Sequence, residues 1–111
     1  MPTAPRLTAE QRAQALADAA EARATRAAVR AELKAGQLSP ADFLARADAD
    51  PRLAAMRVNA LVSALPGYGE ARSTALLAEL GIAESRRIRG LGPRQRESLL
   101  TRLAHRAQSR S

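Results

Sequence analysis

The stretch that decides the fold is LPGYGEARSTALLAELGIAESRRIRGLG, which runs from Leu65 to Gly92. It begins with a proline and two glycines one residue apart, and it ends with three arginines in four positions followed by two more glycines. Glycine adopts the positive φ angles that tight turns require, and proline fixes the φ angle before such a turn. The stretch therefore predicts a sharp connection after Leu65, a helix from Glu70 to Leu80 closed by Gly81, and an arginine-rich loop.

The rest of the chain also has the pattern of helices. Thr8 and Gln11 form a capping box, and the sequence then continues without a helix breaker to Gly36. Capping residues or first-turn prolines indicate further helix starts at Ser39-Pro40, Asp50-Pro51, Asn59 and Gly92-Pro93. No segment alternates apolar and polar residues with a period of two, so we expect an all-α fold with no sheet.

Length and composition limit the cellular setting. The 111 residues suit one domain with an extended arm, and the chain has no cysteine. No apolar run approaches the roughly 20 residues that a bilayer crossing needs, and the N-terminus does not resemble a secretory signal. We therefore expect a cytoplasmic protein with no membrane partner.

The charge distribution favours an anionic partner. The net charge is +7, and residues 57–111 hold 10 of the 18 basic residues but only 4 of the 11 acidic ones. A basic half of this kind most often binds nucleic acid. The chain has only one Phe and one Tyr, whereas proteins that bind single strands stack the bases on several aromatic rings. A duplex is therefore favoured over a single strand.

The first helix segregates its charges. Its basic residues fall on one side and its acidic residues on the other, so opposite charges are never three or four positions apart along it. Like-charged neighbours such as Arg26 and Arg30 destabilise a helix slightly, which indicates that an anion lies along this face. The residues concerned are Arg12, Arg23, Arg26, Arg30 and Lys34, beside an apolar seam of Ala15, Ala22, Val29 and Leu33.

Two further features predict phosphate contacts. The turn at Gly67 and Gly69 leaves the first amides of the following helix available to an anion, and Arg72 adds a full charge. We expect the small residues Ala71, Ala75 and Ala78 to let the flanking helices pack closely. Downstream, the loop arginines have room to reach phosphates or a minor groove, while Ile88 and Leu91 point inward: Arg86, Arg87 and Arg89.

These residues resemble a known family. The segment MRVNALVSALPGYGEARSTALLAELGIAESRRIRGLGPRQRESL, from Met56 onward, is similar to actinobacterial integration host factor, and LTAEQRAQALADAAEARATRAAVRAELK is similar to that family's long first helix. The resemblance covers nearly the whole chain, and Arg86-Arg87-x-Arg89-Gly90-Leu91-Gly92 is its most specific part. It implies a helix–two-turns–helix fold like that of a small-subunit ribosomal protein.

The resemblance also implies a function. The family binds double-stranded DNA with little sequence preference, bends or compacts it in the nucleoid, and supports site-specific recombination, so a recombinase or integrase is an implied partner. Its DNA contacts map onto the turn at Pro66, Gly67, Tyr68, Gly69 and Arg72, and onto the arginine-rich lid at Arg86, Arg87 and Arg89. We also expect contacts from Arg94 at the start of the last helix, and from Arg23, Arg26, Arg30 and Lys34 in the first.

One departure from the family bears on the turn. Family members usually have Lys directly after the second glycine, and often another Lys after the proline, where this chain has Glu70 and Gly67.

The expected organisation is a monomer: a disordered N-terminus at residues 1–7, a long helical arm at 8–36, the helix–two-turns–helix domain at 38–107, and a frayed tail at 108–111.

Two other functional classes remain open. An RNA-binding or ribosomal role is possible because phosphate sites alone do not separate DNA from RNA. A protein-interaction adaptor could pair through the seam of the first helix. An enzyme is disfavoured, since His105 is the sole histidine and no nucleophile–base pair or metal-ligand spacing is evident, so we expect no cofactor and no metal.

Overall fold

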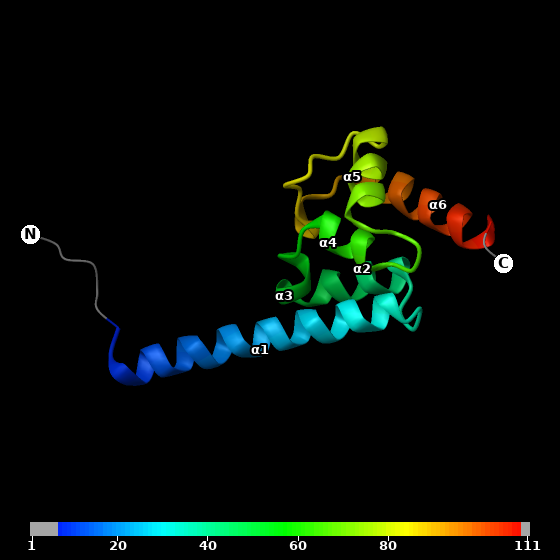
Figure 1. Ribbon diagram of the computed structural model, residues 1–111. Coiled ribbons are helices and arrows are strands. Elements are labelled where there is room, and N and C mark those ends of the chain that lie inside the picture. The colour runs from blue at the N-terminus through cyan, green and yellow to red at the C-terminus, as the bar shows by residue number, and fades with distance from the viewer. Residues whose placement is uncertain (1–6, 110–111) are drawn as a thin grey trace, which may run out of the picture.

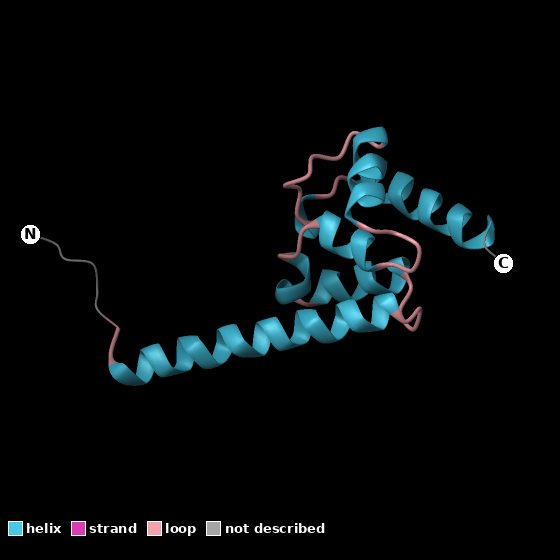
Figure 2. Ribbon diagram, in the orientation of Figure 1, coloured by secondary structure: helices cyan, strands magenta, loops and turns pink. Residues whose placement is uncertain are grey.

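The computed structural model describes residues 7–109, and its side chains as far as His105. Within this range the fold is all-helical (Figure 2). The only extended pairing in this part of the chain is an isolated antiparallel bridge between Arg57 and Arg87. The elements are α1 (Ala9–Lys34), α2 (Pro40–Ala49), α3 (Pro51–Ala54), α4 (Val58–Ala64), α5 (Glu70–Glu79), the 3-10 turn η1 (Ile88–Gly90) and α6 (Pro93–Ser109). The segments predicted as a disordered N-terminus, residues 1–7, and as a frayed tail, residues 108–111, lie largely outside the described part.

Helix α1 is the longest element and is attached at one end. It runs beneath the other helices, and its N-terminal half projects beyond them (Figure 1). The predicted capping box is present, because the Gln11 amide donates to Thr8 Oγ1 and the Thr8 amide donates to Gln11 Oε1. All residues from Leu7 to Glu21 are exposed, whereas Val29 and Leu33 are buried against the domain. Only the last turns of α1 therefore help to form the core.

The core lies among α2, α4, α5 and α6, above the C-terminal half of α1. Burying a leucine or phenylalanine side chain contributes about 1.5–3 kcal/mol, so a small set of such residues accounts for most of the packing. The side chains with at most 1 % exposure include Leu33, Phe43, Leu44, Val58, Leu61, Val62, Leu77 and Leu99. Of the two lid residues predicted to point inward, Ile88 is buried in the core and Leu91 is partly buried against it, and Ile82 is also buried there.

Two local predictions about helices α4 and α5 are wrong. Arg57, not Asn59, is the N-cap of α4, and Asn59 lies inside the helix. Its side-chain oxygen accepts a hydrogen bond from the buried Ser73 hydroxyl of α5. The alanine face of α5 does not pack against α4 either, because Ala71, Ala75 and Ala78 are exposed. Leucines bury far more apolar area than alanines, and α5 turns Leu76 and Leu77 inward together with Ser73.

The described residues contain neither a membrane-spanning helix nor a metal-binding cluster. Over residues 7–109, no helix combines the length and apolar character that a bilayer crossing requires. The same part of the chain contains no group of three His, Cys, Asp or Glu side chains arranged to hold a metal ion.

Candidate nucleic-acid interface

The glycine turn, residues 65–69, joins α4 to α5 through a type II turn. The Tyr68 amide donates to the Leu65 carbonyl at 3.1 Å, Pro66 occupies the second position, and Gly67 at the third has φ +82°. Gly69 is the N-cap of α5, and within the described chain no side chain caps this helix end. The first amides of α5 are thus available to an external acceptor.

Arg72 folds back over this turn. Its Nη1 donates to the Gly67 carbonyl at 3.1 Å while the side chain stays exposed. The guanidinium is therefore held beside the helix N-terminus, where the sequence placed it. Glu70 is also exposed in the first turn of α5, so the turn combines one positive and one negative side chain.

The lid, residues 85–91, is fixed by backbone pairing to the segment before α4. The Val58 amide donates to the Arg86 carbonyl at 2.9 Å, and the Ile88 amide donates to the Met56 carbonyl at 2.8 Å. Together with the burial of Ile88, these bonds hold the lid against the domain although it contains only a short 3-10 turn. The lid arginines consequently project from a rigid base.

The three lid arginines are all exposed but are held differently. Arg87 Nη1 donates to the Ala55 carbonyl at 2.6 Å, and Arg86 Nη1 donates to the Gly90 carbonyl at 3.1 Å. The Arg86 side chain also lies 3.2 Å from where a Cβ on Gly90 would stand, so a larger residue at Gly90 would disturb it. Arg89 extends from η1, and its side chain makes no hydrogen bond or ion pair with the described residues. Carbonyl contacts orient two of the guanidiniums and leave their charge uncompensated.

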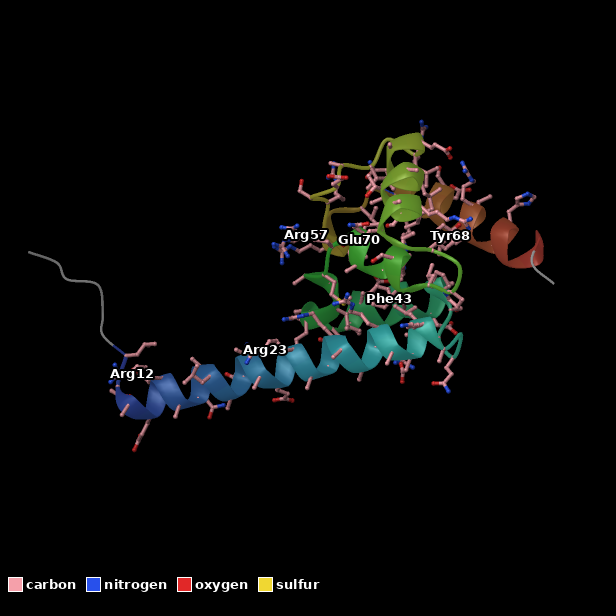
Figure 3. All side chains as sticks on the ribbon, viewed as in Figure 1. Arg12, Arg23, Phe43, Arg57, Tyr68 and Glu70 are labelled. Carbon is pink, nitrogen blue, oxygen red and sulfur yellow. The ribbon has the colours of Figure 1, made fainter. Side chains whose placement is uncertain are left out.

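Helix α1 brings its basic face to both regions. A hollow of about 520 Å³, the turn hollow, lies between Arg30 and Lys34 of α1 and the glycine turn. A second hollow of about 330 Å³, the lid hollow, is lined by Arg26, Arg30, Arg57 and Arg87. Arg30 lines both, so the predicted turn and lid regions are joined along α1. Arg57 lies at the left edge of the helical domain and Tyr68 lies to its right, with α1 running beneath both (Figure 3).

Not every residue that the sequence predicts to contact DNA lines one of these hollows. Arg23 is exposed on α1 and lines neither of them. Arg94 is exposed in the first turn of α6. Arg57, which was not among the predicted DNA-binding residues, lies directly opposite Arg87. Its signal was available, because Arg57 stands between the apolar Met56 and Val58, an alternation that turns the middle residue outward.

Five carboxylates of the described chain form ion pairs, and none of these pairs involves a residue of the predicted interface. The described ion pairs fall on arginines outside the predicted interface: Arg46–Glu32, Arg52–Glu21, Arg52–Asp50, Arg96–Asp48 and Arg102–Glu79. Hydrogen bonds from Arg96 lower the pKa of Asp48, and hydrogen bonds from Arg52 lower the pKa of Asp50. Over the described residues, every arginine of the turn, the lid and the basic face of α1 lacks a carboxylate within 4.0 Å.

Comparison with known proteins identifies the family. Residues 33–103 match the S13-like H2TH domain. The chain is 47% identical over 96 residues to the integration host factors of Mycobacterium tuberculosis and Mycolicibacterium smegmatis, covering 86% of this chain and 91% of each of those proteins. It is 44% identical over 95 residues to the integration host factor of Streptomyces coelicolor.

A solved structure of sIHF bound to an 8-bp palindromic DNA superposes with a TM-score of 0.76 at 38% sequence identity, covering 78% of this chain and 97% of that one. Fold and sequence thus agree over most of the chain. The chain belongs to the actinobacterial integration host factor family, and it carries an S13-like H2TH domain.

Proposed function

We propose that this protein binds double-stranded DNA through the phosphate backbone, with little sequence preference, and that it bends or compacts DNA in the nucleoid. The observation that carries the proposal is the separation of charges: within the described residues, the arginines around the two hollows lack carboxylate partners, and the four arginines that have them lie outside the hollows. Guanidiniums left without a counter-ion bind phosphate oxygens strongly. Similarity to sIHF, which was solved with DNA, supports the same partner.

The proposed contacts form three groups. The glycine turn contributes its backbone and Arg72, and α1 and α6 contribute basic side chains along their exposed faces. The lid contributes the densest charge. The residues are Pro66, Gly67, Tyr68, Gly69 and Arg72; Arg86, Arg87 and Arg89; Arg23, Arg26, Arg30 and Lys34; and Arg94. The proposed role is architectural rather than catalytic. The protein acts as a monomer, and it also assists a site-specific recombinase.

The adaptor alternative loses much of its support. The larger members of the apolar seam, Val29 and Leu33, are buried in the chain's own core, with exposures of 5% and 0%. Only alanines of the seam remain toward the N-terminal end of α1, and alanine methyl groups bury too little area for a strong helix–helix interface. Nucleic acid therefore remains the favoured partner.

Competition binding tests the proposal. Fluorescence anisotropy with a labelled DNA duplex of about 30 base pairs, roughly three helical turns, should show an affinity that falls steeply with salt. The Arg86→Ala/Arg87→Ala/Arg89→Ala variant should bind all sequences more weakly and have a shallower salt slope, by up to about one unit per lost phosphate contact. Duplex RNA that competes as well as DNA would replace the proposal with RNA binding, and unchanged binding by the variant would remove the lid from the interface.

A single substitution gives a cleaner comparison. Arg89→Gln removes one lid charge from a side chain that makes no hydrogen bond or ion pair with the described residues. Arg46→Gln removes one charge from an arginine that is paired with Glu32. Both variants have the same net charge. Weaker DNA binding by Arg89→Gln alone would show that the position of the charge matters, whereas equal losses would show that only net charge matters.

A further inference from the structure

The lid hollow is built from three segments that are distant in sequence. Helix α1 supplies Arg26 and Arg30, the segment before α4 supplies Arg57, and the lid supplies Arg87. Its volume of about 330 Å³ is roughly ten times the ~30 Å³ that one water occupies in the liquid, so phosphate-sized groups can enter. The three segments therefore converge on a site with room for a ligand.

Two of the four arginines, Arg57 and Arg87, are neighbours on the same face of the backbone bridge. The hydrogen bonds from Val58 to Arg86 and from Ile88 to Met56 flank Arg57 and Arg87, which makes these two a non-hydrogen-bonded antiparallel pair. Side chains of such a pair lie on the same face, with Cα atoms about 4.5 Å apart, and like charges there repel each other. The backbone thus imposes a repulsion that the side chains cannot avoid by changing face.

The repulsion has no counter-ion in the described chain. Arg87 is bonded to the neutral Ala55 carbonyl, which orients its guanidinium but leaves its charge uncompensated. Within the described residues, none of the four arginines has a carboxylate within 4.0 Å. Four positive charges around one hollow exceed what a single phosphodiester can neutralise, and a nucleic-acid backbone presents its charges in succession.

We propose that the lid hollow binds two neighbouring phosphates of the DNA backbone, and that Arg57 is a binding residue of this site. The inference rests on the proposed function and deepens it, because α1 and the lid then contact the same phosphates as one clamp. Bound phosphates relieve the repulsion between Arg57 and Arg87, so the ligand-free protein is less stable than its packing allows.

This arrangement gives Arg57 opposite effects on stability and affinity. Arg57→Gln should raise the Tm of the DNA-free protein at low salt by roughly 2–4 °C, because the like-charge pair is lost. The gain should shrink near 1 M salt, where the Debye length is about 3 Å. DNA affinity should fall roughly eightfold at 0.1 M salt, and the salt slope should become shallower by about 0.9, as expected for one phosphate contact.

Arg46→Gln is the matched control. It removes the same charge from an arginine that is paired with Glu32 and lies outside both hollows. We expect no rise in its low-salt Tm and a smaller loss of DNA affinity than for Arg57→Gln. If Arg57→Gln leaves the Tm unchanged or lowers it, or if the two variants lose equal affinity, the proposal is wrong.

Inorganic pyrophosphate separates this proposal from the wider function, because it carries two linked phosphates without a duplex. At matched ionic strength it should raise the Tm of the wild type and of Arg46→Gln, and raise that of Arg57→Gln much less. A pyrophosphate effect in a wild type that does not bind duplex DNA would refute DNA as the ligand while retaining the anion site. DNA binding that survives Arg57→Gln, with no pyrophosphate effect in any variant, would refute the site and leave the wider function standing.

Discussion

The buried Ser73 hydroxyl of α5 donates a hydrogen bond to the side-chain oxygen of Asn59 in α4. Ser73 has 0% exposure, so this bond satisfies a polar group inside the core and fixes the relative position of the two helices that flank the glycine turn. The geometry of the turn therefore depends on a polar contact as well as on leucine packing.

Ser73→Ala should lower the free energy of unfolding by about 1–2 kcal/mol, because Asn59 loses its partner in a region largely closed to water. Urea denaturation followed by circular dichroism would measure the change. Unchanged stability would mean that water replaces the lost donor and that the bond does not hold the helices together.

The two glycines of the turn should respond differently to alanine. Gly67 has φ +82°, where a side chain costs about 1–2 kcal/mol, so Gly67→Ala should lower stability by about that amount. Gly69 has φ −117°, and a Cβ there would meet nothing within 4 Å, so Gly69→Ala should change stability by less than about 1 kcal/mol.

This contrast makes Gly69→Ala a probe of DNA approach. A methyl group that the free protein tolerates can weaken binding only by obstructing a ligand close to the turn. Paired measurements of unfolding and of DNA affinity should show a stable protein with reduced affinity. Full affinity in that variant would place the phosphates away from the Gly69 backbone.

Glu70→Lys should tighten DNA binding roughly threefold to tenfold, because it removes a negative charge and adds a positive one beside the turn. The same substitution should cost about 0.3–1 kcal/mol of stability, since an acid in the first turn interacts favourably with the helix dipole. Anisotropy titrations and thermal unfolding of Glu70→Gln and Glu70→Lys would separate the two effects. Identical DNA affinities for the wild type, Glu70→Gln and Glu70→Lys would place the glycine turn outside the DNA interface.

The ion pair between Asp48 and Arg96 should make stability depend on pH in the acid range. Two hydrogen bonds of 2.9 Å from Arg96 lower the pKa of Asp48 below its unfolded value of about 3.8, so the folded state favours the charged carboxylate. The stabilisation is therefore present above about pH 4 and is lost as pH falls through the lowered pKa.

Asp48→Asn should accordingly flatten the acid decline in stability between about pH 5 and pH 3, while Asp50, whose pKa is also lowered, still contributes. Urea unfolding at a series of pH values would measure both slopes. Parallel slopes for wild type and Asp48→Asn would show that the pair between α2 and α6 contributes nothing to folding.

Local signals predicted most of the fold. The capping box at Thr8 and Gln11 starts α1, and Ser39 caps α2. Of the glycines expected to stop or turn the chain, Gly36, Gly67 and Gly81 have positive φ, whereas Gly69 has φ −117°. These features depend on residues within one helical turn, so the sequence displays them directly. Asn59 was misread because a capping residue and a partner for a distant serine have the same chemistry.

The pairing across the lid could not be predicted in this way. Arg57 and Arg87 are 30 positions apart, and only the bridge between their backbones brings them together. Arg30 likewise joins the turn and the lid because α1 passes beneath both, which depends on how Val29 and Leu33 pack into the core. Sequence reasoning named the basic groups as separate motifs but could not show that they adjoin.

Under the proposed function, the attachment of α1 at one end also sets the length of duplex that this small chain would cover. A helix of 26 residues is about 39 Å long, slightly more than one turn of B-DNA at about 34–36 Å. A compact domain of the same mass would have a footprint limited by its own diameter. Under the proposed function, Arg12 on the projecting half would extend that footprint along the DNA axis, so shortening the helix would reduce the length of duplex covered per molecule before it reduced folding.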